Sequence, residues 1–122
     1  MGLDMFLVTK SKVTGEPEMI YSWRKANQIR QWFVMRFDED DNDCLELVIT
    51  RDDIDALMTD IETVLQNPNE AEAIMPTSSG FFFGGTDYDA YYYQELQDTL
   101  AYLANEFKYN EDKDILFYTE SW

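Results

Sequence analysis

LELVITRDDIDALMTDIETVLQ, residues 45–66, decides the fold because it joins two different hydrophobic periods. Residues 45–50 alternate and are β-branched, which predicts a strand. From residue 51 apolar side chains recur every three or four positions, which predicts a helix over 51–66. Thr50 and Asp53 have the spacing of a capping box, and Asn67-Pro68 ends the helix. A strand therefore leads directly into a helix.

On the C-terminal side, SGFFFGG (79–85) is either a short buried strand or a glycine-flanked loop. Thr86 and Asp89 form a second capping-box-like pair, and the helix that follows is expected to run to about Phe107. A helix of roughly 20 residues would be about 30 Å long, the longest element of the chain. After a turn, ILFYT (115–119) predicts a final strand.

On the N-terminal side, LDMFLVT (3–9) predicts a strand and EMIYSW (18–23) a second, short one. A helical period then runs from Arg24 to Phe37. This segment carries four of the nine basic residues, Arg24, Lys25, Arg30 and Arg36. We expect them to form ion pairs with the protein's own acidic groups, with phosphate contacts as the alternative.

The length of 122 residues fits one domain spanning 1–122, and 45% hydrophobic residues supply a core. Alternating strands and helices permit a parallel sheet. However, only LELVIT and ILFYT are continuous enough for central parallel strands. We therefore predict the α+β class: a single domain with a small mixed or antiparallel sheet and about three helices.

Composition limits the chemistry. The chain has no histidine and one cysteine, Cys44, which excludes Ser-His-Asp and Cys-His catalysis and a structural zinc site. We expect no cofactor, no metal and no enzymatic activity. No apolar run approaches the ~20 residues that span a bilayer, and no secretory pattern opens the sequence. We therefore expect a cytoplasmic protein with no membrane partner.

The net charge is −16, from 25 acidic and nine basic residues. Such a surface repels nucleic acid and attracts basic protein surfaces, although solubility alone also explains it. Residues 38–62 hold eleven acids and one base, a net charge of −10. An EF-hand loop counted from Asp38 fails at positions six and twelve. The candidate partner-binding acids are Asp38, Glu39, Asp40, Asp41, Asp43, Asp52, Asp55 and Glu62.

FFFGGTDYDAYYY, residues 81–93, is dense in aromatic residues. It predicts either a ligand pocket or contact patch, or a second core under the helix that follows. It is no phosphate loop, because the Walker lysine and the GxGxxG spacing are absent. The candidate pocket residues are Arg24, Ser79, Phe82, Thr86, Asp87, Tyr88 and Asp89.

Several blocks together resemble an uncharacterised family of small acidic proteins encoded by phages and prophages. The blocks are GLDMFL (2–7), WRKANQIRQWF (23–33), PTSSGFFFGGTDYDAYYYQEL (76–96) and the final TESW. They cover about a third of the chain in the same order. This sequence departs from the family in its short linking segments and in having Arg30 where a histidine is often found. The resemblance implies a phage setting and no specific activity.

Two functional hypotheses follow. The first is a phage-encoded interaction protein whose acidic, nucleic-acid-mimicking surface inhibits a host defence or nucleic-acid-processing complex such as CRISPR or restriction. Its partner would be a host protein with a basic surface, with no direct nucleic-acid contact. The second is a small-ligand-binding protein or carboxylate-dependent enzyme that uses the SGFFFGGTDYD region. A homodimer joined through the aromatic stretch is a third alternative.

Overall fold

The structure, a computed structural model, describes residues 2–39, 43–80 and 83–122. In this part of the chain four strands form one sheet of order β2-β1-β4-β3, with antiparallel pairing throughout. The strands are β1 (Asp4–Ser11), β2 (Pro17–Arg24), β3 (Glu46–Ile49) and β4 (Asp114–Ser121). The α+β prediction is confirmed, and the sheet is antiparallel rather than mixed.

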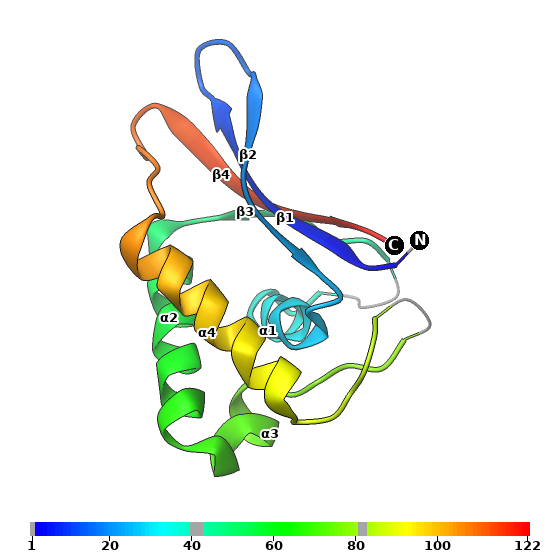
Figure 1. Ribbon diagram of the computed structural model, residues 1–122. Helices are drawn as coiled ribbons and strands as arrows, with labels where there is room; N and C mark the ends of the chain where they lie inside the picture. The colour runs from blue at the N-terminus through cyan, green and yellow to red at the C-terminus, as the bar shows by residue number, and fades with distance from the viewer. Residues whose placement is uncertain (1, 40–42, 81–82) are drawn as a thin grey trace.

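Three longer helices and two short ones complete the described part of the chain. They are α1 (Asn27–Phe37), α2 (Arg51–Gln66), the 3-10 helix η1 (Pro68–Glu70), α3 (Ala71–Ile74) and α4 (Ala90–Asn105). Figure 1 shows all helices on one side of the sheet, with α1 beneath the strands and α2 beside α4. None of these helices is long and apolar enough to cross a membrane.

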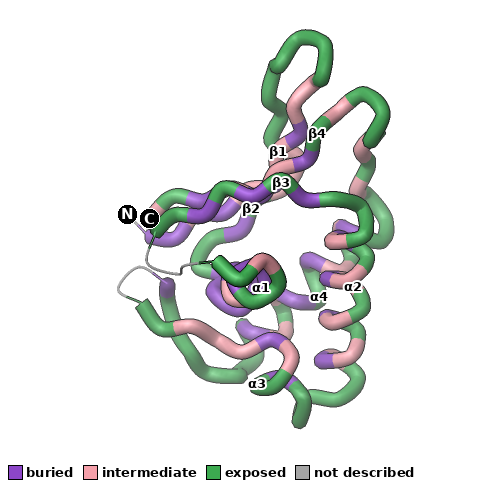
Figure 2. The backbone as a smooth tube through the Cα atoms, turned by 180° about the vertical axis from the view of Figure 1, so that it is seen from behind, coloured by how far each residue is buried: buried purple, intermediate pink, exposed green. Residues whose placement is uncertain are grey.

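The core lies between the sheet and the helices, where Figure 2 shows the buried segments. Alternate side chains of each strand point to this layer, as the pleat requires. From the two central strands these include Met5, Leu7, Leu116 and Tyr118. The helices contribute the buried residues Ile29, Phe33, Ile54, Leu57, Ile61, Leu96 and Leu103.

Helix α2 spans the predicted residues, and its capping box is confirmed. The Thr50 side chain accepts a hydrogen bond from the backbone N–H of Asp53, and the Asp53 carboxylate accepts one from the Thr50 backbone. This device needs only four consecutive residues, which is why sequence reasoning found it.

The other two long helices begin later than predicted. Lys25 has φ 57°, a left-handed conformation that separates β2 from α1, so α1 begins at Asn27 and not at Arg24. The N-cap of α4 is Asp89, whose side chain accepts from the backbone N–H of Tyr92, and not Thr86. Helix α4 has 16 residues and ends at Asn105, short of Phe107.

The segment 79–85 forms no strand among its described residues, so the loop alternative is the correct one. Phe83 is buried and its ring lies against Gly80, where an added Cβ would come within 2.8 Å of the ring. Phe82 lies outside the described residues, as do Asp40 and Asp41 of DEDDND (38–43), the segment whose sequence predicts an acidic turn.

Three of the four basic residues of the 24–37 segment form internal ion pairs, as predicted, whereas Lys25 takes part in none of the ion pairs between described residues. Arg24 pairs with Asp4 at 3.0 Å, and Arg36 pairs with Asp53 at 2.7 Å. Arg30 pairs with Glu120 at 2.8 Å, and both side chains are fully buried.

Candidate functional site

A cleft of about 360 Å³ opens where the β2–α1 junction meets the 76–89 loop and the start of α4. We call it the charged cleft. It is lined by Arg24, Lys25, Ala26, Asn27, Gln28, Thr77, Gly85, Asp87, Asp89, Tyr91, Tyr92, Gln94 and Glu95. Its volume is at the lower end of the range for small-molecule sites. Residues more than 50 positions apart in sequence therefore share one concave surface.

Lys25 shapes the first wall. Its backbone N–H donates to the carbonyl of Leu3 at 2.7 Å. Its backbone is in the left-handed conformation, which residues other than glycine rarely adopt. Gly84, at φ 82°, lies close to this lysine, and a Cβ there would come within 3.2 Å of the Lys25 Cβ. The strain at Lys25 is thus held by contacts with the strand β1 end and the loop. Strained residues of this kind concentrate at functional sites.

Asn27 fastens the loop to the first turn of α1. Its buried side-chain amide donates to the carbonyls of Phe83 at 2.9 Å and Gly85 at 2.8 Å. Its side-chain oxygen accepts from the backbone N–H of Ser78 at 2.9 Å. One side chain therefore ties both arms of the loop to the helix.

The two arms of the loop are also joined to each other. The Thr77 hydroxyl donates to the carbonyl of Thr86 at 2.9 Å, and its backbone N–H donates to the Tyr88 hydroxyl at 3.3 Å. The Tyr92 hydroxyl donates to the Met75 carbonyl at 2.6 Å, which anchors the base of the loop to α4. Compact loops with joined ends, such as this one, frequently carry function.

Helix α4 supplies the opposite wall. The Asp89 carboxylate caps the helix through the backbone N–H of Tyr92 at 3.1 Å. One turn further on, Glu95 is partly buried. Burial, and then the negative charge of Asp98, raise the pKa of the Glu95 carboxyl above its ordinary value. A carboxyl with a raised pKa in a cleft is a feature of binding and catalytic sites.

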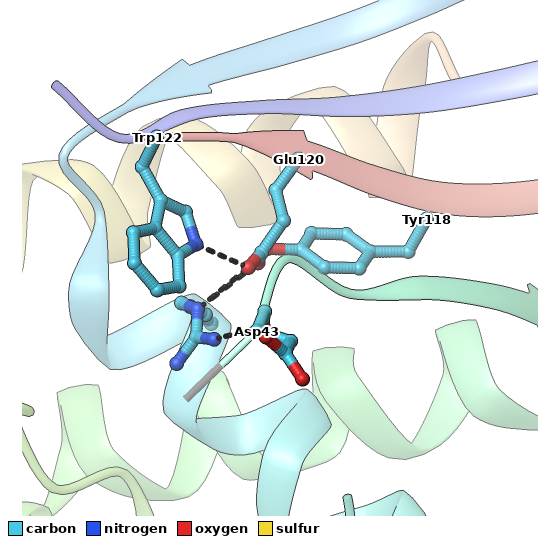
Figure 3. A network of polar contacts seen from close by, with 5 residues as sticks. Asp43, Tyr118, Glu120 and Trp122 are labelled. Atoms are coloured by element: carbon cyan, nitrogen blue, oxygen red, sulfur yellow. Dashed lines mark hydrogen bonds and ion pairs between the residues drawn. The ribbon is translucent and has the colours of Figure 1, made fainter. Parts of the chain in front are cut away.

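A buried polar network joins β4 to α1 (Figure 3). The Nε of Arg30 lies 2.8 Å and 3.1 Å from the two carboxylate oxygens of Glu120, which also accept from the Tyr118 hydroxyl and the Trp122 indole N–H, each at 2.7 Å. Arg30 donates in addition to the backbone carbonyl of Asp43. Its guanidinium carbon is 4.7 Å from the centre of the Phe83 ring. The network thus links β4, α1, the acidic turn and the loop.

The described candidate acids lie outside the lining of the charged cleft. Asp38, Glu39, Asp43, Asp52, Asp55 and Glu62 are all exposed, and none of the ion pairs among the described residues involves them. Asp52, Asp55 and Glu62 share the outer face of α2, and we call them the α2 acidic stripe. By contrast, Asp53 and Asp60 turn inward, to Arg36 and to the indole of Trp32. Within the described ranges no cluster of ligating side chains suits a metal ion.

The structure divides the candidate pocket residues. Arg24, Asp87 and Asp89 line the charged cleft. Thr86 and Tyr88 instead brace the loop through Thr77, and Ser79 is exposed outside the cleft lining. Sequence reasoning did not assign Lys25 and Glu95 to the pocket. The sequence shows that Lys25 is next to Arg24, but it does not show that α4 lies close to the β2–α1 junction.

Sequence reasoning also gave no supporting role to Glu120 and Trp122, although both belong to the final TESW block. No protein-family model, curated protein or solved structure matches the chain. The functional assignment therefore rests on the charged cleft and the acidic surface.

Proposed function

We propose that the protein binds a small polar ligand in the charged cleft, which was the second of the two functional hypotheses. The observation that carries this proposal is the way Asn27 holds the loop against α1 with its three hydrogen bonds. This arrangement holds the loop that carries Asp87 beside the β2–α1 junction, so that Asp87, Asp89, Arg24 and Lys25 line one concavity. A concave site with a few converging polar groups is the usual form of a ligand pocket.

The lining favours recognition over covalent chemistry. Arginine, lysine, glutamine and carboxylate side chains supply donors, acceptors and charges of both signs. The sequence has no histidine to act as a general base near neutral pH, and its one cysteine lies outside the cleft. The ligand-binding half of that hypothesis is therefore the better supported.

A thermal-shift screen against nucleotides, sugars, amino acids, amines, carboxylates and metal ions tests this proposal. We expect a compound that raises Tm for the wild type and not for Asp87→Asn. The matched control is Asp112→Asn, another exposed aspartate, which lies outside the cleft. Failure of every compound class, or a shift that Asp87→Asn leaves intact, would contradict the proposal.

The acidic-inhibitor hypothesis remains as a second candidate, and the α2 acidic stripe favours it. Asp52, Asp55 and Glu62 are exposed along about 15 Å of helix, at 1.5 Å per residue, with no cation paired to them in the described structure. In this proposal a phage-encoded protein acts in the host cytoplasm and occludes the basic nucleic-acid channel of a defence complex such as CRISPR or restriction. Exposed, unneutralised carboxylates are what such a channel would bind.

Pull-down from host lysate at low and high salt tests this second candidate. The wild type should retain a nucleic-acid-binding protein at low salt, and added duplex DNA should displace it. The variant Asp52→Lys/Asp55→Lys/Glu62→Lys should lose that protein. The control Glu16→Lys/Glu18→Lys reverses exposed charges at the β1–β2 hairpin and should keep it. Retention by the α2 variant would refute the mimicry mechanism.

A further inference from the structure

The charged cleft has walls of opposite sign. Arg24 and Lys25 lie on the wall formed by the β2–α1 junction. Asp87 and Glu95 lie on the wall formed by the loop and α4. A ligand with a single charge would be attracted by one wall and repelled by the other. A ligand that carries both charges meets complementary groups on each side.

The start of α1 strengthens the positive wall. Its N-cap residue is Ala26, which has no side-chain acceptor, and no side chain caps this helix end. The Asn27 side chain is already engaged by the loop. A helix N-terminus carries about half a positive charge and favours a carboxylate. Beside it, Arg24 pairs with Asp4 on an exposed surface, where ion pairs are weak and readily exchanged.

The negative wall is only partly engaged within the protein. Asp89 already caps α4, whereas none of the ion pairs between described residues uses Asp87 or Glu95. Glu95 is partly buried, and burial together with the nearby Asp98 charge raises the pKa of its carboxyl. An ammonium group nearby would stabilise the charged form of this carboxyl.

The size of the cleft limits the ligand. A volume of 360 Å³ equals that of about twelve water molecules at ~30 Å³ each, which is enough room for an amino acid or a dipeptide. Gln28 and Gln94 also line the cleft, but their side-chain nitrogens already donate to the Tyr92 carbonyl and the Asp98 carboxylate. Their amide oxygens are the groups that could accept from the ligand's remaining donors.

We propose that the ligand is a zwitterion of amino-acid size. Its carboxylate lies at Arg24, Lys25 and the start of α1, and its ammonium lies between Asp87 and Glu95. This inference rests on the proposed ligand-binding function and specifies its chemical class.

Isothermal titration calorimetry with three matched probe series tests the inference. The series are the twenty standard amino acids, their N-acetyl derivatives, which lack the ammonium, and their amides, which lack the carboxylate. At least one free amino acid should bind, and both of its derivatives should bind roughly tenfold or more weakly, because each loses a charged contact.

Two variants assign the ends of the ligand. Glu95→Gln should weaken binding of the free amino acid and leave the N-acetyl derivative unchanged. Lys25→Gln should weaken the free amino acid and leave the amide unchanged. The matched control, Lys113→Gln, lies outside the cleft and should change neither affinity.

The results of these titrations distinguish failure of the zwitterion assignment from failure of the proposed ligand-binding function. If an N-acetyl derivative or an amide binds as tightly as the free amino acid, the zwitterion assignment is wrong while the cleft remains a binding site. The same holds if only another compound class binds with dependence on Asp87. If no compound of any class binds, the proposed function fails and the inference fails with it.

Discussion

Arg30 is fully buried, and its guanidinium forms an ion pair with the Glu120 carboxylate. We predict that Arg30→Met destabilises the fold by about 3–5 kcal/mol, because it leaves the Glu120 charge buried without its counter-ion. Thermal and urea unfolding would measure the change. The double variant Arg30→Met/Glu120→Gln removes both charges and should recover part of the loss. A stable Arg30→Met protein would show that Glu120 does not need this partner.

Glu95 gives a pH-dependent prediction. Because burial raises its pKa in the folded state, the unfolded chain loses this proton at a lower pH than the folded protein does. The resulting stability is present below the ordinary pKa of about 4.3 and is lost as pH rises through the folded value. Glu95→Gln should therefore raise Tm by about 1–3 °C at pH 7 and leave it unchanged at acidic pH. The exposed Glu62→Gln should show no such pH-dependent gain.

The sequence could suggest a role for a residue only where the residues that define this role are close to it in the chain. Asp87 was a candidate because its carboxylate stands in the aromatic stretch 81–93, and it lines the charged cleft. Lys25 and Glu95 join it only through the approach of α4 to the β2–α1 junction, which no local period encodes. Arg30 was expected to form an ion pair, but its depth was not foreseen. Charged residues are seldom fully buried, and burial here depends on the distant Glu120.

At the scale of elements, the Asn27 side chain makes three hydrogen bonds that hold the 76–89 loop to α1. We predict that Asn27→Ala destabilises the protein by about 3 kcal/mol, since it removes three hydrogen bonds at about 1 kcal/mol each. The loop should then become the first site of proteolytic cleavage and the fastest segment in hydrogen exchange. Ligand binding should weaken in parallel.

A variant of another loop contact separates this effect from general destabilisation. Thr77→Val removes the hydroxyl that joins the arms, while Asn27 still holds both of them. In the Thr77→Val protein, the loop should be cleaved and should exchange its amide hydrogens more slowly than in Asn27→Ala. Equal exposure of the loop in both variants would mean that Asn27 has no special role.

The elements themselves were largely predictable because most of their signals are short-range. The alternation of residues 45–50 and the capping box of Thr50 fixed the strand and the start of α2. The start of α1 was predicted three residues too early, because the left-handed turn at Lys25 is imposed by Leu3 and Gly84, far away in sequence. Strand order was likewise beyond local patterns, since β1 pairs with β4 across the whole chain.

At the scale of the molecule, the net charge of −16 should make stability depend on salt. Raising ionic strength from 0.01 M to 0.15 M shortens the screening length from about 30 Å to about 8 Å. Self-repulsion then falls, and we predict that Tm rises by about 2–5 °C. Reversing the three charges of the α2 acidic stripe changes the net charge from −16 to −10 and should reduce this salt effect. A Tm that is independent of salt would show that the carboxylates are already well separated.

The strand order carries a consequence for how the protein is made. Strand β4 is synthesised after the other three, yet it lies between β1 and β3 and pairs with both. Until residues 114–121 leave the ribosome, the β1–β2 hairpin and β3 have no sheet to join, and α1 and α2 have no complete surface to cover. Synthesis at about 5–20 residues per second leaves the nascent chain in this open state for many seconds. Closure of the sheet is therefore expected to wait until β4 has been made, and the nascent chain is the form most exposed to chaperones and proteases.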